Sequence, residues 1–366
     1  MRICAVVPCY RARRHILDVL RRLLPYVEHV FVVDDACPEG TGDLVASSYP
    51  APDRVSVIRN AVNRGVGGAT IAGYEAALSA GFDVMVKLDA DGQMDPAYIP
   101  ALVQPILDGT ADYAKGNRFY RHQYLRRMKT MRLFGNSVLS FMTKASSGYW
   151  GLMDPTNGFT ALHATAANEI GFEKIAQRYF FESDMLFRLN IARAVVRDVP
   201  MPAIYGSEIS NLNVLSALFT FPFLHLRNAG KRFVYSYLLR DFNVGTIQAI
   251  AGACLLAFGV IFGATTWISN AEANISTPVG TVMLATLPII LGFQLLLSAL
   301  SFDISNVPTH PLQIQLKYLY QASPELHPGA TEQKLQIPRQ SARREFDPSS
   351  RHEPRRDLEK QETKPR

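Results

Sequence analysis

A short acidic segment directly after an apolar run carries side chains that could hold a metal ion. The run is Val84–Val86 and the segment is Lys87-Leu-Asp-Ala-Asp-Gly-Gln-Met-Asp-Pro96. In extended backbone, residues i and i+2 point to one side, so Asp89 and Asp91 can converge at the carboxyl end of a strand. Two carboxylates there supply part of the oxygen shell of a divalent cation and leave positions for a diphosphate. Gln93 could add an amide oxygen, and the alternative is a polar loop that caps the next helix.

Two further acids and a glycine-rich segment follow other apolar runs. Asp34 and Asp35 come after Val30–Val33, where their carboxylates could bind a ribose or a base, or could equally cap the following helix. Asn63-Arg-Gly65-Val-Gly67-Gly68-Ala opens a helix-length segment, and its glycines allow close approach of the backbone. Thr70 stands at the third glycine position of the dinucleotide fingerprint, which disfavours NAD binding.

The second half of the first 200 residues carries more charged side chains that could take part in chemistry. Seven basic residues occur with no acid between them: Lys115, Arg118, Arg121, Arg126, Arg127, Lys129 and Arg132. Such a run is usually a solvated face, but it could bind substrate phosphates or anionic lipid. Asp154 in Met153–Phe159, and Glu182 and Asp184 in Phe180–Asp184, offer carboxylates that a turn or a helix cap could also explain.

The elements that must position these residues are those of an α/β fold. From Arg2 to about Tyr205, short β-branched runs alternate with helix-length segments, which predicts a mainly parallel sheet covered by helices. We expect strands at Ile3–Pro8, His29–Val33, Val55–Arg59, Val84–Leu88 and Tyr113–Gly116. We expect helices on the face formed by Ile16, Val19, Leu20 and Leu23, and over Ile71–Ala80 and Tyr98–Leu107.

The composition points to a membrane. Of 366 residues, 48% are apolar and 19% charged, which is high in apolar content for a soluble protein and excludes a disordered chain. No Asp, Glu, Lys or Arg occurs in Phe242–Ala271 or in Ala273–Phe302. Within these stretches, Val244–Ile268 and Val279–Ser301 are each long enough to cross a bilayer. A buried helical pair in a soluble core is the alternative.

The charges around the two stretches predict an orientation. Basic residues precede the first stretch and Lys317 follows the second, whereas the turn between them carries Glu272 and no basic residue. The positive-inside rule therefore places both ends in the cytoplasm. We expect residues 206–243 to form amphipathic juxtamembrane helices in the headgroup layer, and a third span over the uncharged Ile209–Leu226 is the alternative. Residues 302–366, rich in proline and mixed charge towards the end, are expected to be a largely disordered cytoplasmic tail.

Several other classes of protein are disfavoured. Four cysteines and eight histidines show no metal-ligand spacing, which argues against zinc sites and a disulfide framework. A net charge of +6 is too small to indicate nucleic-acid binding. Met1–Tyr10 has only a short apolar run followed by arginines, so we expect a strand there and not a signal peptide.

Taken in order, these segments resemble the inverting family 2 glycosyltransferases of the GT-A fold, and among them the dolichyl- and polyprenyl-phosphate sugar synthases such as dolichol-phosphate mannosyltransferase. The similar segments are Val6–Tyr10, Val33–Asp35, Asn63–Ala69, Leu88–Pro96, Gly116–Arg118 and Asp154–Phe159, followed by the apolar hairpin. The resemblance implies a GT-A catalytic domain, with a Rossmann-like and mainly parallel sheet, over residues 1–205. Interfacial helices over 206–243 and two transmembrane helices within 244–301 would follow.

The resemblance also implies roles for single residues. It implies that Asp89 and Asp91 hold Mg²⁺ or Mn²⁺, with Gln93 as a third ligand. The implied nucleotide-sugar pocket consists of Pro8, Tyr10, Asp34, Asp35, Asn63, Gly65 and Asp89. Phosphate and acceptor contacts are implied for Arg118, Arg132, Asn157, Glu182 and Asp184, and a catalytic part for Asp154 beside Arg118. The chain departs from the family at Arg11-Ala12, where Asn-Glu is common, and at Ala36-Cys37, where Gly-Ser is usual.

The expected activity is that of a membrane-anchored hexosyltransferase. It would move mannose or glucose from GDP-mannose or a UDP-hexose to polyprenyl or dolichyl phosphate, with inversion and with a divalent metal. We expect a multi-pass protein of the inner (cytoplasmic) membrane with its catalytic domain and tail in the cytoplasm. We expect no nucleic-acid partner, and the sequence allows a homo-oligomer. The alternatives are a glycosyltransferase that acts on a non-lipid glycan acceptor in cell-surface polysaccharide synthesis, and a catalytically inactive scaffold that binds nucleotide sugars.

Overall fold

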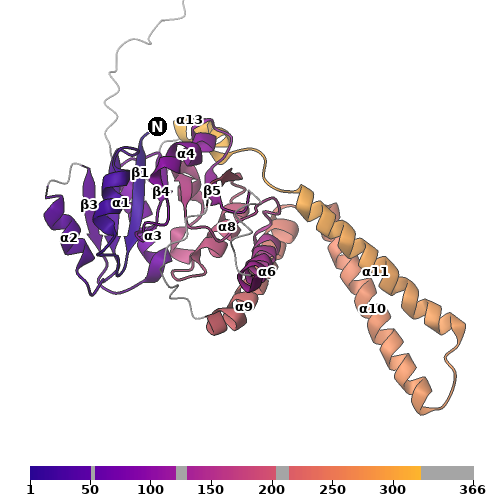
Figure 1. Cartoon of the computed structure of the whole chain (residues 1–366). Helices are drawn as coiled ribbons and strands as arrows, with labels where there is room; N and C mark the ends of the chain where they lie inside the picture. Colours follow the sequence, from indigo (N-terminus) through magenta and orange to yellow (C-terminus); the bar gives the residue numbers. More distant parts are fainter. Residues whose placement is uncertain (51–53, 121–129, 203–213, 323–366) are drawn as a thin grey trace, which may run out of the picture. The chain divides into compact units, whose positions relative to one another are not determined.

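The computed structural model describes residues 1–50, 54–120, 130–202 and 214–322, of which 130–134, 136, 214–219, 318 and 320 are described by their backbone alone. The chain begins with a seven-stranded sheet in the order β3-β2-β1-β4-β6-β5-β7 (Figure 1). Its strands are β1 (Ile3–Cys9), β2 (His29–Asp34), β3 (Val55–Arg59), β4 (Val84–Lys87), β5 (Tyr113–Asn117), β6 (Thr160–His163) and β7 (Val196–Pro200). Only β6 runs antiparallel to its neighbours, so the predicted α/β fold with a mainly parallel sheet is confirmed.

The central strands β1 and β2 are buried on both faces because helices cover both faces of the sheet. Alternate residues of β1 enter different cores: Val6 packs with α3 (Gly65–Ser79) and α8 (Phe181–Ile191), while Val7 packs with α1 (Ile16–Leu23) and α4 (Ile99–Leu107). The remaining short helices of this part are α2 (Thr41–Ser48), η1 (Pro96–Tyr98), α7 (Ala164–Glu169) and η2 (Phe172–Lys174). This double covering fixes the strand ends at which the candidate residues lie.

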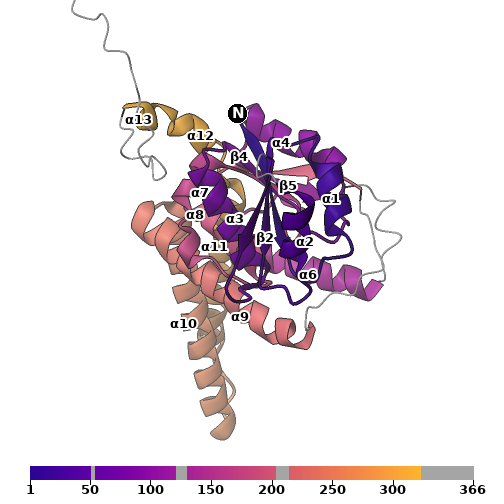
Figure 2. The ribbon, with the colours of Figure 1, turned by 90° about the vertical axis from the view of Figure 1, so that its left-hand side faces the viewer.

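Two long helices pack against each other beside the sheet domain. Helix α6 (Thr130–Ser147) and helix α9 (Val214–Arg232), which continues as the π-helix η3 (Phe233–Arg240), lie side by side in both views (Figures 1 and 2). Buried polar contacts fix α9: the Ser146 hydroxyl lies 2.8 Å from His225 Nδ1, and Asn228 Nδ2 donates to Asp184 Oδ1 at 2.8 Å. The face of α9 that makes these contacts is therefore the inner one.

The two apolar stretches form the helices α10 (Val244–Glu272) and α11 (Val279–Ser305), which pack side by side (Figure 1). Both are long and apolar enough to cross a membrane, and only 11% and 6% of their most apolar windows are buried. This low burial argues against the alternative of a buried pair in a soluble core. Their contact is built on glycines: a Cβ on Gly252 would lie 2.9 Å from the Gly292 carbonyl oxygen, and one on Gly259 would lie 2.7 Å from that of Ala285.

The chain after α11 returns to the sheet domain. Helices α12 (Leu312–Gln315) and α13 (Lys317–Ala322) follow, and the backbone N–H groups of Leu312 and Gln313 donate to the Asp112 carboxylate at 2.8 and 3.0 Å. Gln313 Nε2 also donates to the carbonyl oxygens of Ile106 and Ala111. Residues 302–322 are thus folded, which differs from the expectation of a largely disordered tail over 302–366. This segment folds because the apolar side chain of Leu312 is buried and because the Asp112 carboxylate accepts two of its backbone N–H groups. Residues 323–366 lie outside the described part.

Candidate active site

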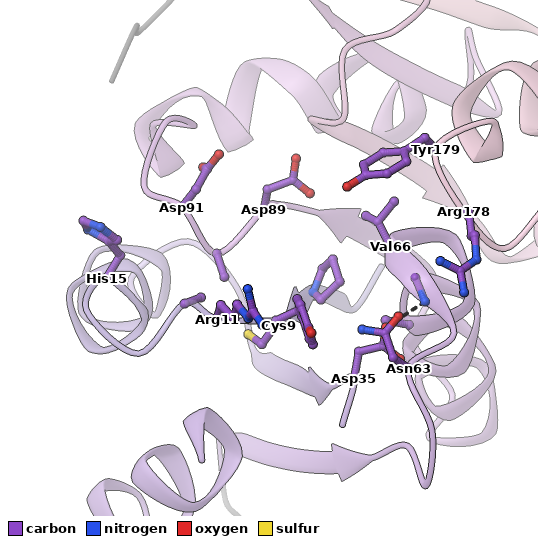
Figure 3. Close-up of a pocket in the computed structure, with 16 residues that line it drawn as sticks. Cys9, Arg11, His15, Asp35, Asn63, Val66, Asp89, Asp91, Arg178 and Tyr179 are labelled. Carbon is purple, nitrogen blue, oxygen red and sulfur yellow. Dashed lines mark hydrogen bonds between the residues drawn. The ribbon is translucent and has the colours of Figure 1, made fainter. Parts of the chain in front are cut away.

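A cavity of about 540 Å³ opens at the carboxyl ends of β1, β2 and β4 (Figure 3). Its lining includes seven of the predicted residues: Pro8, Tyr10, Asp35, Asn63, Gly65, Asp89 and Asp91. The other lining residues are Cys9, Arg11, Ala12, His15, Val66, Ala69, Ala90, Arg178 and Tyr179. Parallel strands end together at this edge, which is where open α/β sheets bind ligands.

Asp89 and Asp91 both line the cavity from the loop after β4 (Figure 3). Each is partly exposed. The strand ends at Lys87 and Asp91 lies in a turn, so this turn, and not extended backbone as predicted, brings Asp91 to the cavity beside Asp89. Asp91 Oδ1 accepts a hydrogen bond from the backbone N–H of Gln93 at 2.9 Å, which holds the tight turn at Gly92. Gln93 is not among the lining residues, and no group of three or more His, Cys, Asp or Glu side chains in the described ranges could hold a metal. The loop after β4 therefore offers two carboxylates to a cation in the cavity.

A buried lysine stands behind this pair. Lys87 is 1% exposed, and its Nζ donates to Asp89 Oδ1 at 2.8 Å, to the Gly158 carbonyl oxygen at 3.3 Å and to Glu182 Oε1 at 3.4 Å. Burial lowers the pKa of Lys87, but the carboxylates of Asp89 and Glu182 outweigh burial and raise this pKa above the ordinary lysine value. The ammonium group thus fixes the position of Asp89 and links it to the N-terminus of α8.

The two acids after β2 are held by backbone N–H groups. Asp34 accepts from the N–H of Cys37 and of Gly42, each at 2.7 Å, and does not line the cavity. Asp35 lines the cavity, but its oxygens accept from the N–H of Arg64 at 2.9 Å and of Gly65 at 2.7 Å, and also from Asn60 Nδ2. The Asp35 carboxylate therefore also fixes the start of α3.

The glycine-rich start of α3 approaches another loop of the protein closely. A Cβ on Gly67 would lie 2.6 Å from the Ala176 carbonyl oxygen and 2.8 Å from that of Gln177, and the N–H of Gly68 donates to the Gln177 oxygen at 2.9 Å. This contact places the next two residues, Arg178 and Tyr179, at the cavity. The glycines for which we predicted close backbone approach thus position the loop that carries Arg178 and Tyr179, which line the cavity.

Arg118 and Asp154 form an ion pair outside the cavity lining. Arg118 Nε donates to Asp154 Oδ2 at 2.7 Å, Arg118 Nη2 donates to Oδ1 at 3.1 Å, and the Arg118 backbone N–H donates to Oδ2 at 3.2 Å. The Asp154 side chain is fully buried, and that of Arg118 is 32% exposed. Two guanidinium nitrogens of Arg118 are therefore engaged by Asp154.

The remaining predicted residues connect elements around the site. Asn157 Nδ2 donates to the Gly116 carbonyl oxygen at 2.7 Å, and the buried Asp184 accepts from the Ala176 N–H at 2.8 Å as well as from Asn228. Glu182 faces Lys87. Arg132 is described only by its backbone in α6, and the basic residues 121–129 lie outside the described part.

Sequence reasoning missed Lys87, which lies behind the cavity, and Arg11 and Arg178, which line it. Lys87 follows the same i, i+2 spacing as Asp89 and Asp91, so the strand pattern already contained its signal. Arg11 and Arg178 come from different loops and bring positive charge to the cavity (Figure 3). Arg178 belongs to a loop for which we predicted no motif. Contacts of this loop with the start of α3 and with Asp184 place it at this edge.

Comparisons with known proteins agree with this architecture. The profile of the family described as "Glycosyl transferase family 2" matches residues 4–171. An undecaprenyl-phosphate mannosyltransferase of Micrococcus luteus is 33% identical over 205 residues, which cover 55% of this chain and 82% of that protein. A polyprenol monophosphomannose synthase of Mycolicibacterium smegmatis is 30% identical over 60% of this chain and 84% of that protein. A UDP-N-acetylglucosamine–dolichyl-phosphate N-acetylglucosaminyltransferase of Methanococcus voltae is 28% identical over 56% of this chain and 86% of that protein.

The chain belongs to glycosyltransferase family 2, and its sheet domain has the GT-A-like fold. The protein is a glycosyltransferase. The predicted fold and enzyme class are thereby confirmed.

Proposed function

We propose that this enzyme transfers a hexose, mannose or glucose, from GDP-mannose or a UDP-hexose to polyprenyl or dolichyl phosphate, with inversion at the anomeric carbon. The observation that carries the proposal is a donor-sized cavity edged by Asp89 and Asp91 in a chain that also has two membrane-length helices. The names of the relatives, which specify lipid phosphates and either mannose or N-acetylglucosamine, support this acceptor class.

The donor set of the cavity fits a divalent cation. Asp89 and Asp91 present partly exposed carboxylates from one loop, and Asp89 Oδ2 accepts no hydrogen bond from the described residues. Two hard oxygen ligands suit Mg²⁺ or Mn²⁺ that takes its other ligands from a diphosphate and water. Such an ion would neutralise charge on the departing nucleoside diphosphate. Arg11 and Arg178 line the same cavity, so their guanidinium groups are placed to bind the donor phosphates.

The proposed acceptor needs no protein base. A phosphate monoester has its second pKa near 6, so it is largely dianionic at neutral pH and can attack the anomeric carbon directly. Asp154 and Asp184 are buried, already accept hydrogen bonds from Arg118 and from the Ala176 N–H, and do not line the cavity. Their proposed part is to position Arg118, α8 and the loop that carries Arg178.

We further propose that the catalytic part and both ends of the hairpin lie on the cytoplasmic side of the inner membrane. Leu312 and Gln313, which follow α11, bind Asp112 next to β5. The start of α10 and the end of α11 are therefore both connected to the catalytic domain. Basic residues Arg227, Lys231 and Arg240 precede α10 and support the cytoplasmic side. We also propose that residues 206–243 form the juxtamembrane segment.

The test is a product analysis with the purified full-length protein. Labelled GDP-mannose, UDP-glucose and UDP-N-acetylglucosamine are each incubated with polyprenyl phosphate, and the lipid products are identified by mass spectrometry. The proposal expects a glycosyl phosphate lipid from a hexose donor and its loss when a chelator is added. Transfer only to a glycan acceptor would overturn the proposed acceptor, and undiminished transfer with the chelator would overturn the metal.

A further inference from the structure

A second groove lies at the other end of α8 from the donor cavity. It encloses about 1210 Å³ between the segment Glu169–Ile191 on one side and the segment Phe223–Leu239 of α9 and η3 on the other. The groove and the donor cavity share no lining residue. Glu182, in the first turn of α8, faces Lys87, whereas Arg188 in the groove lies six residues further on, about 9 Å along the helix axis.

The groove is strongly positive. Four basic side chains line it, Lys174, Arg188, Arg227 and Lys231, against a single acid among its lining residues, Glu169. Arg227 and Lys231 are exposed and form no ion pair with an acid of the described chain. The Arg188 guanidinium donates through Nη2 to the Lys174 carbonyl oxygen at 3.0 Å, while its buried Nε has no hydrogen-bond partner in the described part. Lys174 pairs with Glu173 at 3.6 Å, so Arg227 and Lys231 are the exposed cations available to an anionic group.

The same helix face also exposes large apolar side chains. Phe223, Leu226 and Leu239 are 66%, 72% and 74% exposed, and all three line the groove. The i, i+3 and i+4 spacing of 223, 226, 227, 230, 231 and 234 places apolar and basic residues on one stripe. This stripe lies away from His225 and Asn228, which make the buried contacts of α9. An apolar stripe of this kind marks an interaction site and not a surface in contact with water. The stripe ends near Arg240, just before α10 begins at Val244.

We propose that this groove binds an anionic glycerophospholipid of the surrounding bilayer. The phosphate diester would bind Arg227 and Lys231, with Arg188 at the base of the groove, and an acyl chain would lie along Phe223 and Leu226. Charge complementarity favours this occupant. An anionic headgroup neutralises Arg227 and Lys231, whereas a zwitterionic headgroup carries a positive group that these two side chains repel. The site goes beyond sugar transfer and requires no ligand in the donor cavity.

The experiment measures lipid binding to the full-length protein in uncharged detergent by calorimetry. The probes are short-chain phosphatidylglycerol, short-chain phosphatidylcholine and inorganic phosphate. The double variant Arg227→Gln/Lys231→Gln is compared with Arg21→Gln/Arg197→Gln, which removes the same charge from exposed positions outside the groove. We expect phosphatidylglycerol to bind the wild type and the control alike, and the groove variant to bind about 30-fold more weakly, since each basic side chain near an anionic lipid contributes about fivefold.

Other results would overturn the proposal. Equal affinity for phosphatidylcholine would show that charge does not select the ligand, and equal affinity for inorganic phosphate would show a free-anion site. An equal loss in the control would show a non-specific charge effect. Unchanged lipid binding in the groove variant, together with a smaller particle mass in light scattering, would assign this face to a second copy of the chain. Because no probe is a nucleotide sugar, failure here leaves the proposed transfer reaction unaffected.

Discussion

The ion pair between Arg118 and Asp154 provides a quantitative test of whether Asp154 is a structural carboxylate or a general base. The Asp154 side chain is fully buried, while the Arg118 side chain keeps 32% of its exposure. Arg118→Gln would leave a buried carboxylate without its cation, which costs about 3–5 kcal/mol of stability. Asp154→Asn would leave a guanidinium group that can turn towards water, so the loss is that of hydrogen bonds to a charged group, about 1.5–3 kcal/mol.

The double variant completes a mutant cycle. Because both single substitutions remove the same interaction, the double variant should be less destabilised than the sum of the two, by about 2 kcal/mol. Urea unfolding in detergent micelles, followed by tryptophan fluorescence, gives the three free energies. Trp150, in the loop before Asp154, is one of only two tryptophans in the chain.

Turnover of the same variants separates the two roles. If the acceptor is a dianionic phosphate, Asp154→Asn should keep the transfer rate within about tenfold of the wild type, whereas loss of a general base lowers rates about 10²- to 10⁴-fold. The reasoning is refuted if Asp154→Asn is as stable as the wild type while its turnover falls by the larger factor.

Three further predictions follow from the packing of the site. Gly158→Ala should lower turnover, because its Cβ would lie 2.6 Å from Lys87 Nζ and 2.9 Å from Asp89 Oδ2. Gly67→Ala should raise the KM for the donor, because its Cβ would displace the loop that carries Arg178. Burial lowers the pKa of His163 to about 4, against about 6.5 in the unfolded chain, so the stability that His163 contributes is present above about pH 6.5 and is lost as the pH falls towards 4, up to about 3 kcal/mol.

Each of these predictions has a control or a contrary outcome. Gly151→Ala is matched to both glycine variants, because its Cβ would meet nothing within 4 Å. Equal kinetics for all three glycine variants would contradict the packing argument. His163→Asn keeps an acceptor for the Thr165 N–H, so the variant should fold and its urea midpoint should change less between pH 7 and pH 5 than that of the wild type. An unchanged pH dependence would contradict the assignment to His163.

The sequence predicted those parts of the fold that local patterns determine. The five expected strands are present, and four of them, all but Tyr113–Asn117, are rich in the β-branched residues that favour strands. The cavity lies at the end of β4, and Asp89 and Asp91 line it. Strands β6 and β7 were not predicted. Thr160–His163 is only four residues long, and β7 carries the exposed Arg197 between buried valines, so neither has a strong strand pattern.

The functions of single acids depended on contacts that no local pattern contains. Asp35 accepts from Gly65, 30 positions away, and Asp154 from Arg118, 36 positions away. Sequence reasoning allowed both a ligand role and a capping role for Asp34 and Asp184. Asp34 accepts from the N–H of Gly42 in the first turn of α2, as a capping side chain does. Asp184 instead lies inside α8 and binds the loop at Ala176 and Asn228 of α9. The contact of Leu312 with Asp112, 200 positions away, likewise folds a segment that by composition belongs with the tail.

The most direct test of the proposed donor site is nucleotide-dependent Mn²⁺ binding, followed by electron paramagnetic resonance. The wild type is compared with Asp89→Asn, Asp91→Asn and the matched control Asp95→Asn, whose side chain in the same segment pairs with Arg22 instead of lining the cavity. We predict that GDP or UDP tightens Mn²⁺ binding in the wild type and in the control, and that either of the other two substitutions abolishes this effect. Nucleotide-dependent Mn²⁺ binding of equal strength in all four proteins would contradict the account.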